Sequence, residues 1–142
     1  MTTPETRDLT GTVVAVTGAA GGIGGATVRL ALAAGARVVA ADLRADALAP
    51  LVEEFGDRVR TVGGDVREEA TADALVAAAV ESHGRIDSVV ANAAVGYYGG
   101  ILDQSADEVR RMVDVNVTGT VWLVRAAVRR FREQGDGGDV VV

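Results

Sequence analysis

The sequence predicts an α/β fold in which helices cover both faces of one parallel sheet. Short β-rich apolar runs alternate with longer helical segments along the whole chain, and a glycine-rich stretch joins the first run to the first helix. Ala, Val and Gly dominate the composition, while aromatic residues make up only 4%. Regular alternation of this kind is typical of a doubly wound parallel sheet with right-handed crossovers. Small side chains suit helices that pack closely on such a sheet.

The expected strands are continuous apolar runs, which is typical of strands buried on both faces. They span residues 12–16, 37–41, 59–62, 86–91 and 140–142. Four helices are expected between them, at residues 26–34, 45–55, 68–82 and 105–132. Gly35 closes the first helix, Pro50 is expected to bend the second, and Gly119 is expected to make the last one irregular.

The length and composition limit the classes of function. A chain of 142 residues forms one domain, which we place at residues 9–142 after a flexible N-terminus at residues 1–8. The net charge of −6 argues against a nucleic-acid partner, which would need clustered positive charge. Cysteine is absent and histidine occurs once, so neither a disulfide nor a metal site is expected. No apolar run is long enough to span a bilayer, and we expect a cytoplasmic protein without a membrane partner.

The stretch Thr17–Gly24, "TGAAGGIG", lies between the first expected strand and helix. A dinucleotide pyrophosphate must approach backbone N–H groups at a helix N-terminus, and glycines leave that approach open. Gly18, Gly22 and Gly24 have the useful spacing, and Ile23 is expected to insert into the core below the loop. A purely structural turn is the alternative. The preceding buried strand and the following small-residue helix favour a dinucleotide site.

Asp42 follows the second expected strand directly and is followed by Leu43. An acid at this position in such folds accepts hydrogen bonds from the adenosine ribose, and its charge repels a 2′-phosphate. The sequence therefore favours NAD over NADP, although Arg44 is a residue type that binds a 2′-phosphate. A local role for Asp42 as a helix N-cap or a loop acid is the alternative, and Asp46 is a second candidate for such a role.

Four motifs, in order, resemble those of the short-chain dehydrogenase/reductase superfamily, and the resemblance covers the chain from Leu9 onward. "TGAAGGIG" is similar to the family's TGxxxGxG loop. Asp65-Val66 matches its adenine-contacting pair, with a helix cap as the alternative role of Asp65. Ala91–Ala94, "ANAA", resembles its NNAG signature, with Ala94 in place of glycine. Asn116, in "VDVNVTGT", falls on the position of its catalytic asparagine.

The resemblance implies a Rossmann-like sheet with strand order 3-2-1-4-5 and an oxidoreductase that moves a hydride between NAD(H) and a secondary alcohol or ketone. It implies one catalytic residue in this chain, Asn116, which holds a water in a proton relay. The implied cofactor-binding residues are Thr17, Gly18, Gly22, Ile23, Gly24, Asp42, Leu43, Asp65, Val66, Asn92 and Ala93. No residue is expected to bind a metal.

The family's remaining catalytic groups are a serine, a tyrosine and a lysine, the last two in a YxxxK motif after the fifth strand. This chain is truncated inside that strand, at "GGDVVV", and all 14 of its basic residues are arginine. Tyr97 and Tyr98 begin no YxxxK; they either line a substrate pocket or cover their own loop. Ser82 and Ser88 lie at element ends, and Ser105 is expected to cap the last helix with Glu108.

Two further expectations concern the rest of the chain. His83 is assigned to a helix C-terminus, where it would interact with the helix dipole. A valine-rich last strand leaves an exposed edge, and a stripe formed by Val113, Val117, Trp122 and Val124 would need a partner. We therefore expect a longer chain, a homo-oligomer or a complementing polypeptide.

These observations leave three functions open. The first is the dinucleotide-binding part of a dehydrogenase, which is not catalytically complete within these 142 residues. The second is a non-catalytic dinucleotide-binding module or one half of a split enzyme. The third is a structural fragment without cofactor affinity.

Overall fold

The computed structural model describes residues 7–142, so the prediction of a flexible N-terminus falls mostly outside the described residues. Five parallel strands form one sheet in the order β3-β2-β1-β4-β5, which confirms the predicted topology. The strands are β1 (Val13–Thr17), β2 (Arg37–Asp42), β3 (Val59–Gly63), β4 (Ser88–Val90) and β5 (Asp139–Val141).

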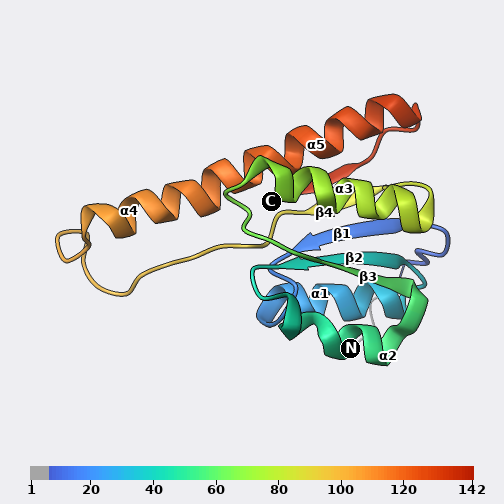
Figure 1. Ribbon diagram of the computed structural model, residues 1–142, viewed down its shortest axis with the longest axis horizontal. Coiled ribbons are helices and arrows are strands. Elements are labelled where there is room, and N and C mark those ends of the chain that lie inside the picture. Colours follow the sequence, from blue (N-terminus) through green and yellow to red (C-terminus); the bar gives the residue numbers. More distant parts are fainter. Residues whose placement is uncertain (1–6) are drawn as a thin grey trace.

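Helices cover both faces of the sheet, as Figure 1 shows. On one face lie α1 (Gly22–Ala33) and α2 (Ala49–Phe55), and on the other lie α3 (Glu69–His83) and α5 (Gly119–Gln134). Two short 3₁₀ turns, η1 (Ala45–Leu48) and η2 (Gly56–Arg58), flank α2. Pro50 lies in the first turn of α2, where a missing N–H is harmless, so the break precedes it.

The side chains of β1 alternate between two apolar cores. Val13 and Ala15 pack towards α3 and α5, while Val14 and Val16 pack towards α1 and α2. All four are buried, as expected for a strand that has a helix layer on each face. This burial fixes the register of β1 and thereby the position of its carboxyl end.

The last helical stretch is irregular, as predicted, but the irregularity precedes Gly119. It consists of α4 (Ala106–Val113), a π-helical segment η3 (Asp114–Thr118) and α5. Ser105 caps α4, and Glu108 completes the predicted capping box. In Figure 1, α4 extends beyond the end of the sheet, together with the loop that precedes it.

The predicted exposed stripe is partly wrong. Val113 and Val117 are exposed, but Trp122 is half-buried against the core of α3 and α5, and its indole Nε1 donates to the carbonyl of Arg67. Val121 and Val128 are exposed instead. Val124 is half-buried too. Trp122 follows Val113 by nine residues, which is two and a half turns of a regular helix, so the two residues do not share a face.

The carboxyl-terminal strand is exposed as predicted, with Val141 at 52% relative accessibility. The ladder between β4 and β5 extends beyond β4, since the N–H of Ala91 donates to Val141 and that of Asp139 to Asp87. The paired segment is therefore close to the predicted residues 86–91. None of the described helices is long and apolar enough to cross a bilayer.

Candidate functional site

The candidate site lies at the carboxyl edge of the sheet, where the loops after β1, β2, β3 and β4 converge. In open parallel sheets this edge, near the point where the strand order reverses, is where ligands bind. β1 lies between β2 and β4, so the reversal falls beside β1. The glycine loop leaves the sheet at that point.

The glycine loop has a backbone that only glycine adopts easily. Gly18 and Gly22 have φ of +67° and +56°. Gly24 is buried against the loop, and an added Cβ there would meet the carbonyl oxygen of Gly18 and come within 2.5 Å of Asn92 Nδ2. Gly24 therefore brings the start of α1 close to the end of β1.

The N-terminus of α1 is open to an anion. Its N-cap, Gly21, contributes no side chain, and within residues 7–142 no side chain caps this helix end. The first N–H groups of a helix have no partner within the helix and carry its positive dipole end. This loop therefore has the form of a phosphate-binding site.

The prediction that Ile23 inserts into the core is wrong. Its side chain is 79% exposed, because Gly24, Val28 and Leu32 form the buried face of α1. Ile23 precedes that face by one residue and lies on the exposed side with Leu30. Its contribution to the loop is therefore its backbone.

Asp42 connects the end of β2 to the glycine loop. Its Oδ2 accepts a hydrogen bond from the N–H of Ala20 at 3.0 Å, and its Oδ1 accepts from the N–H of Arg44 at 3.2 Å. Neither bond caps a helix, since Arg44 is the residue at the N-cap of η1, but both are bonds to loop N–H groups, as the alternative role of a loop acid predicts. A carboxylate offers about four acceptor positions, so Asp42 has capacity for further donors.

Asp65 is paired with Arg67 two residues further on. The guanidinium Nη2 lies 2.6 Å from Asp65 Oδ2, and these bonds lower the pKa of the Asp65 carboxyl. The alternative role of Asp65 as a helix cap is not observed, because Glu68 is the N-cap of α3. Asp65 therefore keeps its charge at the edge of the site.

Thr17, Asn92 and Ala93 join the ends of β1 and β4. Asn92 Nδ2 donates to the carbonyls of Thr17 and Gly18 at 3.0 and 3.2 Å. The buried Thr17 hydroxyl accepts from the N–H of Ala93 at 3.1 Å. Ala94 replaces the family's glycine without strain, since no non-glycine residue among those described has a positive φ.

A cavity of about 160 Å³ joins most of the predicted cofactor residues. Its lining combines predicted residues with others that the sequence analysis did not single out. The lining residues are Gly18, Asp42, Leu43, Gly64, Asp65, Val66, Arg67, Ala93, Ala94, Val95, Arg111 and Val115. Gly22, Ile23 and Gly24 lie outside this lining, on the first turn of α1.

Asn116 lies in the π-helical segment and faces the loop after β4. Its Oδ1 accepts from the N–H of Val95 and its Nδ2 donates to the carbonyl of Val95, both at 2.9 Å. Its own carbonyl accepts from the Thr120 hydroxyl at 2.8 Å. The side chain is therefore used to hold the loop, while the backbone carbonyl accepts from the Thr120 hydroxyl.

The sequence itself matches a known family over nearly its whole length. The family model described as short chain dehydrogenase matches residues 12–142. The chain belongs to the short-chain dehydrogenase family.

Several named relatives of this short-chain dehydrogenase chain are similar to it at 34–41% identity. It is 41% identical over 138 residues to a hexahydroindene-carboxyl-CoA reductase of Mycobacterium tuberculosis, a match over 94% of this chain and 53% of the relative. It is 38% identical over 137 residues to an L-rhamnose 1-dehydrogenase (NAD(P)(+)) of a Sphingomonas strain, over 94% and 54%. The chain spans about half the length of the curated relatives it matches, or less.

Solved structures of the family have the same fold. A short-chain type dehydrogenase/reductase from Mycobacterium marinum matches with a TM-score of 0.88 and 30% identity, over 99% of this chain and 58% of that one. A 3-ketoacyl-(acyl-carrier-protein) reductase from Brucella melitensis, complexed with NADH, matches with a TM-score of 0.83 and 34% identity, over 89% and 53%.

The other polar candidates of this short-chain dehydrogenase chain do not join the site. Ser82 is in α3, Ser88 begins β4 and Ser105 caps α4, as predicted. Tyr98 is fully exposed, and neither Tyr97 nor Tyr98 lines the cavity. Among the described residues, no group of acids and histidines has the arrangement of a metal site.

The predicted dipole interaction of His83 needs correction. His83 is the last residue of α3, but burial lowers its pKa, and the nearby cations Arg37 and Arg60 lower it further. The imidazole is therefore mainly neutral at pH 7 and does not supply the cation that a helix C-terminus favours.

The sequence analysis missed Arg67 and Arg111. Arg67 directly follows the Asp65-Val66 pair, so its position was a usable signal. Arg111 lies one helical turn before Val115, and the spacing of four places both on one face of a helix. That face was predictable only once the helix was known to cross the carboxyl edge of the sheet.

Proposed function

We propose that this chain is the dinucleotide-binding part of an NAD-dependent oxidoreductase that acts on a secondary alcohol or ketone. One observation carries the proposal: Gly18 of the glycine loop and the carboxylates of Asp42 and Asp65 line one cavity at the edge of the sheet, and the same loop leads from Gly18 to the open N-terminus of α1. An anion-binding helix end beside two acceptor groups matches a pyrophosphate flanked by a ribose and a base.

The proposal assigns each predicted residue a contact. The backbone N–H groups of Gly22, Ile23 and Gly24 hold the pyrophosphate, and Thr17 and Gly18 shape the turn beneath it. Asp42 accepts from the adenosine ribose hydroxyls next to Leu43. Asp65 and Val66 face the adenine, and Asn92 and Ala93 line the nicotinamide ribose side. When bound, NAD supplies or accepts the hydride at its nicotinamide ring.

NAD is favoured over NADP by the charge of Asp42. The N–H groups of Ala20 and Arg44 hold this carboxylate at the end of β2, where it retains acceptor capacity for ribose hydroxyls. A 2′-phosphate at the same position would bring two negative groups together. The backbone of Arg44, rather than its side chain, is the part bonded to Asp42.

The proposed chemistry needs groups in addition to Asn116. We place a water of the proton relay near the Asn116 carbonyl, which the Thr120 hydroxyl already orients. The family's chemistry also uses a lysine, and these 142 residues contain none. The proposal therefore assigns the serine, tyrosine and lysine to residues outside these 142, in the same or a second polypeptide. A non-catalytic dinucleotide-binding module is the alternative.

The assembly and location belong to the same proposal. The exposed valines Val113, Val117, Val121 and Val128 recur at helical spacing along η3 and the flanking helices, and they favour packing in a homo-oligomer. Cytoplasmic location is proposed with it. Analytical ultracentrifugation and fractionation of source cells test these two points.

Calorimetric titration of the purified protein with NAD and NADP tests the proposed function. We expect NAD to bind more tightly, and the Asp42→Ala substitution to reduce that preference by removing the negative charge. Asp46→Ala is the matched control, because Asp46 lies in η1 and does not line the cavity. Flat titrations with both dinucleotides would overturn the proposal, and binding without turnover of any alcohol or ketone would favour the non-catalytic module.

A further inference from the structure

The ion pair between Asp65 and Arg67 contains more hydrogen bonds than a single contact between two charged groups. Three different N–H groups of Arg67 reach the one carboxylate. The backbone N–H donates to Oδ1 at 3.0 Å, Nη2 donates to Oδ2 at 2.6 Å, and Nε is shared between Oδ1 and Oδ2 at 3.1 and 3.0 Å. The carboxylate is thereby fixed in both position and rotation.

The fixed carboxylate can still be reached from the cavity. An ionised carboxylate only accepts hydrogen bonds, and its two oxygens have about four lone-pair positions. Arg67 makes four contacts with it, two at each oxygen, but the single Nε hydrogen is divided between the two oxygens. The Asp65 side chain keeps 25% of its area exposed, and both residues line the cavity, so a donor of a ligand can reach the carboxylate.

Two residues of α5, Gly119 and Trp122, contact the segment that carries Arg67. The Trp122 indole Nε1 donates to the Arg67 carbonyl at 3.2 Å. Gly119 packs against Val66 so closely that an added Cβ would lie 3.0 Å from the Val66 carbonyl oxygen. Segment 65–67 is therefore held by α5 on one side and open to the cavity on the other.

A carboxylate that is fixed in position and rotation distinguishes purines at their 6-position. A 6-amino group donates an N–H to it, whereas a 6-oxo group presents a second acceptor and repels it. The ion pair keeps the pKa of Asp65 below its ordinary value, so the carboxyl does not turn into a donor for the 6-oxo group near neutral pH.

We propose that Arg67 is a positioning residue that gives the pocket its preference for a 6-aminopurine dinucleotide over a 6-oxopurine one. The proposal rests on the proposed function, in which Asp65 faces the base. Arg67 acts through Asp65: without Arg67 the carboxylate rotates freely, and its oxygens are no longer aimed at the base. The preference between bases then falls even though Asp65 is still present.

The test compares the dissociation constants of NAD and of nicotinamide hypoxanthine dinucleotide, which differ in the 6-substituent of the purine and in the proton that the 6-oxo form carries on N1. A hydrogen bond to a charged group is worth a preference of about tenfold or more, so we expect the wild-type protein to favour NAD by about that factor. We expect Arg67→Ala to reduce the ratio severalfold. Loss of a positive charge alone weakens the binding of both dinucleotides equally. The ratio of their dissociation constants therefore reports the positioning of Asp65 and not the net charge.

Three further variants sharpen the result. Arg110→Ala removes an arginine whose guanidinium pairs with Asp107 on exposed α4, and it should leave the ratio unchanged. Arg67→Lys keeps the charge but loses the planar fork, so it should resemble Arg67→Ala. The double variant Asp65→Asn with Arg67→Ala should have nearly the same ratio of dissociation constants as Asp65→Asn alone, since Arg67 acts through Asp65.

The outcomes separate the two proposals. A wild-type preference for NAD that Arg67→Ala and Arg67→Lys leave intact overturns the positioning role. Equal binding of the two dinucleotides by the wild-type protein also overturns it, while the proposed function stands. Failure to bind either one overturns the proposed function, and the positioning role with it. Circular dichroism of each variant shows that the fold persists.

Discussion

The side-chain amide of Asn116 makes two reciprocal hydrogen bonds with the backbone N–H and carbonyl groups of Val95. Oδ1 accepts from the Val95 N–H and Nδ2 donates to the Val95 carbonyl, both at 2.9 Å. Gln134, at the end of α5, makes the same reciprocal pair with Ile86, at 2.9 and 2.8 Å. The helical stretch from α4 to α5 therefore holds the chain on both sides of β4.

We expect Asn116→Ala to loosen the loop after β4. Each hydrogen bond contributes about 1 kcal/mol net, so loss of the pair should lower the free energy of unfolding by about 1–2 kcal/mol. Hydrogen exchange at the Val95 amide should accelerate, because its acceptor is gone. Gln134→Ala is the matched variant, and it should accelerate exchange at Ile86 without affecting Val95. Unchanged Val95 protection in Asn116→Ala would contradict the assignment.

The glycine loop gives a second prediction. In Gly24→Ala the new Cβ would meet the carbonyl oxygen of Gly18 and lie 2.5 Å from Asn92 Nδ2, so α1 must move away from β1. Such overpacking typically costs about 1–3 kcal/mol, and the loop should lose its shape. We expect a lower urea midpoint and loss of dinucleotide binding.

Gly25→Ala is the control for that substitution. Its Cβ would lie 3.4 Å from the nearest atom, an ordinary contact within a helix. Replacing a helical glycine by alanine stabilises by up to about 1 kcal/mol, so this variant should be neutral or more stable. Equal losses in Gly24→Ala and Gly25→Ala would mean that the close approach of Gly24 to Gly18 does not determine the effect.

The sheet was predictable because its signals are local. Strands buried on both faces are continuous apolar runs, and the glycine loop identifies the crossover that follows β1. The strand order, the capping box at Ser105 and the edge position of the last strand followed from those signals and the family motifs, and the structure confirms them.

The errors arose where the rotation of a helix decides the outcome. The loop motif fixes the spacing of Ile23 but not the face of α1 on which it lies, and the close approach of Gly24 turns Ile23 outwards. The predicted stripe placed Trp122 with Val113, but nine residues are two and a half turns of a regular helix, so the two residues lie on opposite sides and Trp122 packs inwards. The rotation of α1 depends on tertiary contacts, which one sequence does not contain.

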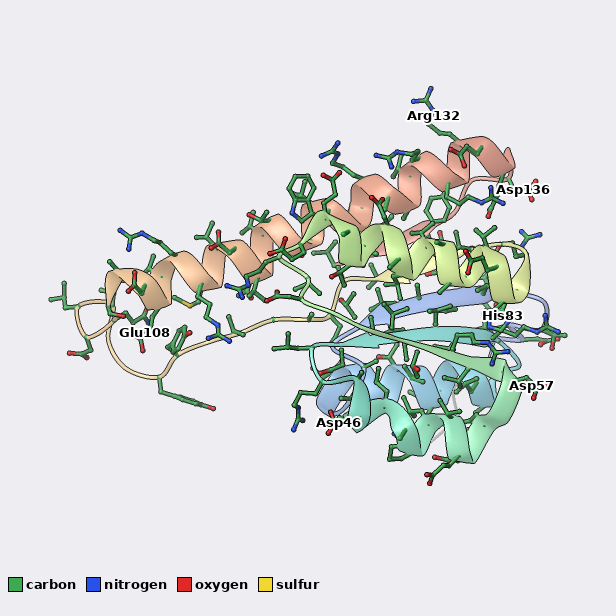
Figure 2. The ribbon with its side chains drawn as sticks, viewed as in Figure 1. Asp46, Asp57, His83, Glu108, Arg132 and Asp136 are labelled. Atoms are coloured by element: carbon green, nitrogen blue, oxygen red, sulfur yellow. The ribbon has the colours of Figure 1, made fainter. Side chains whose placement is uncertain are left out.

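His83 gives a prediction about pH. Figure 2 shows it at the end of α3, beside the edge of the sheet. Its pKa in the folded protein lies below its ordinary value of 6.5, so the unfolded chain binds more protons just below pH 6.5. The stability that neutral His83 contributes is complete above pH 6.5 and is lost as the pH falls through the folded pKa.

We therefore expect His83→Gln to flatten the pH dependence of stability. Urea unfolding between about pH 7.5 and 5.5 should show a smaller loss in the variant than in the wild type, in a range where the ordinary carboxyl groups stay ionised. His83 Nε2 is buried and has no hydrogen-bond partner among the described residues, so replacement removes no bond from that atom. Parallel curves for the two proteins would show that His83 does not titrate in this range.

The contact between Gly119 and Val66 links the helix of Asn116 to the adenine side of the cavity. In Gly119→Ala the new Cβ would lie 3.0 Å from both Val66 Cγ2 and the Val66 carbonyl oxygen, so either α5 or segment 65–67 must shift by a few tenths of an ångström. A shift of α5 should weaken the Trp122–Arg67 hydrogen bond, which starts one turn further along. The fluorescence of Trp122, the one tryptophan of the chain, should move to longer wavelength, and NAD binding should weaken.

Gly96→Ala is the control for Gly119→Ala, since nothing lies within 4 Å of its added Cβ. Wild-type fluorescence and NAD affinity in Gly119→Ala would show that this contact yields without disturbing the site.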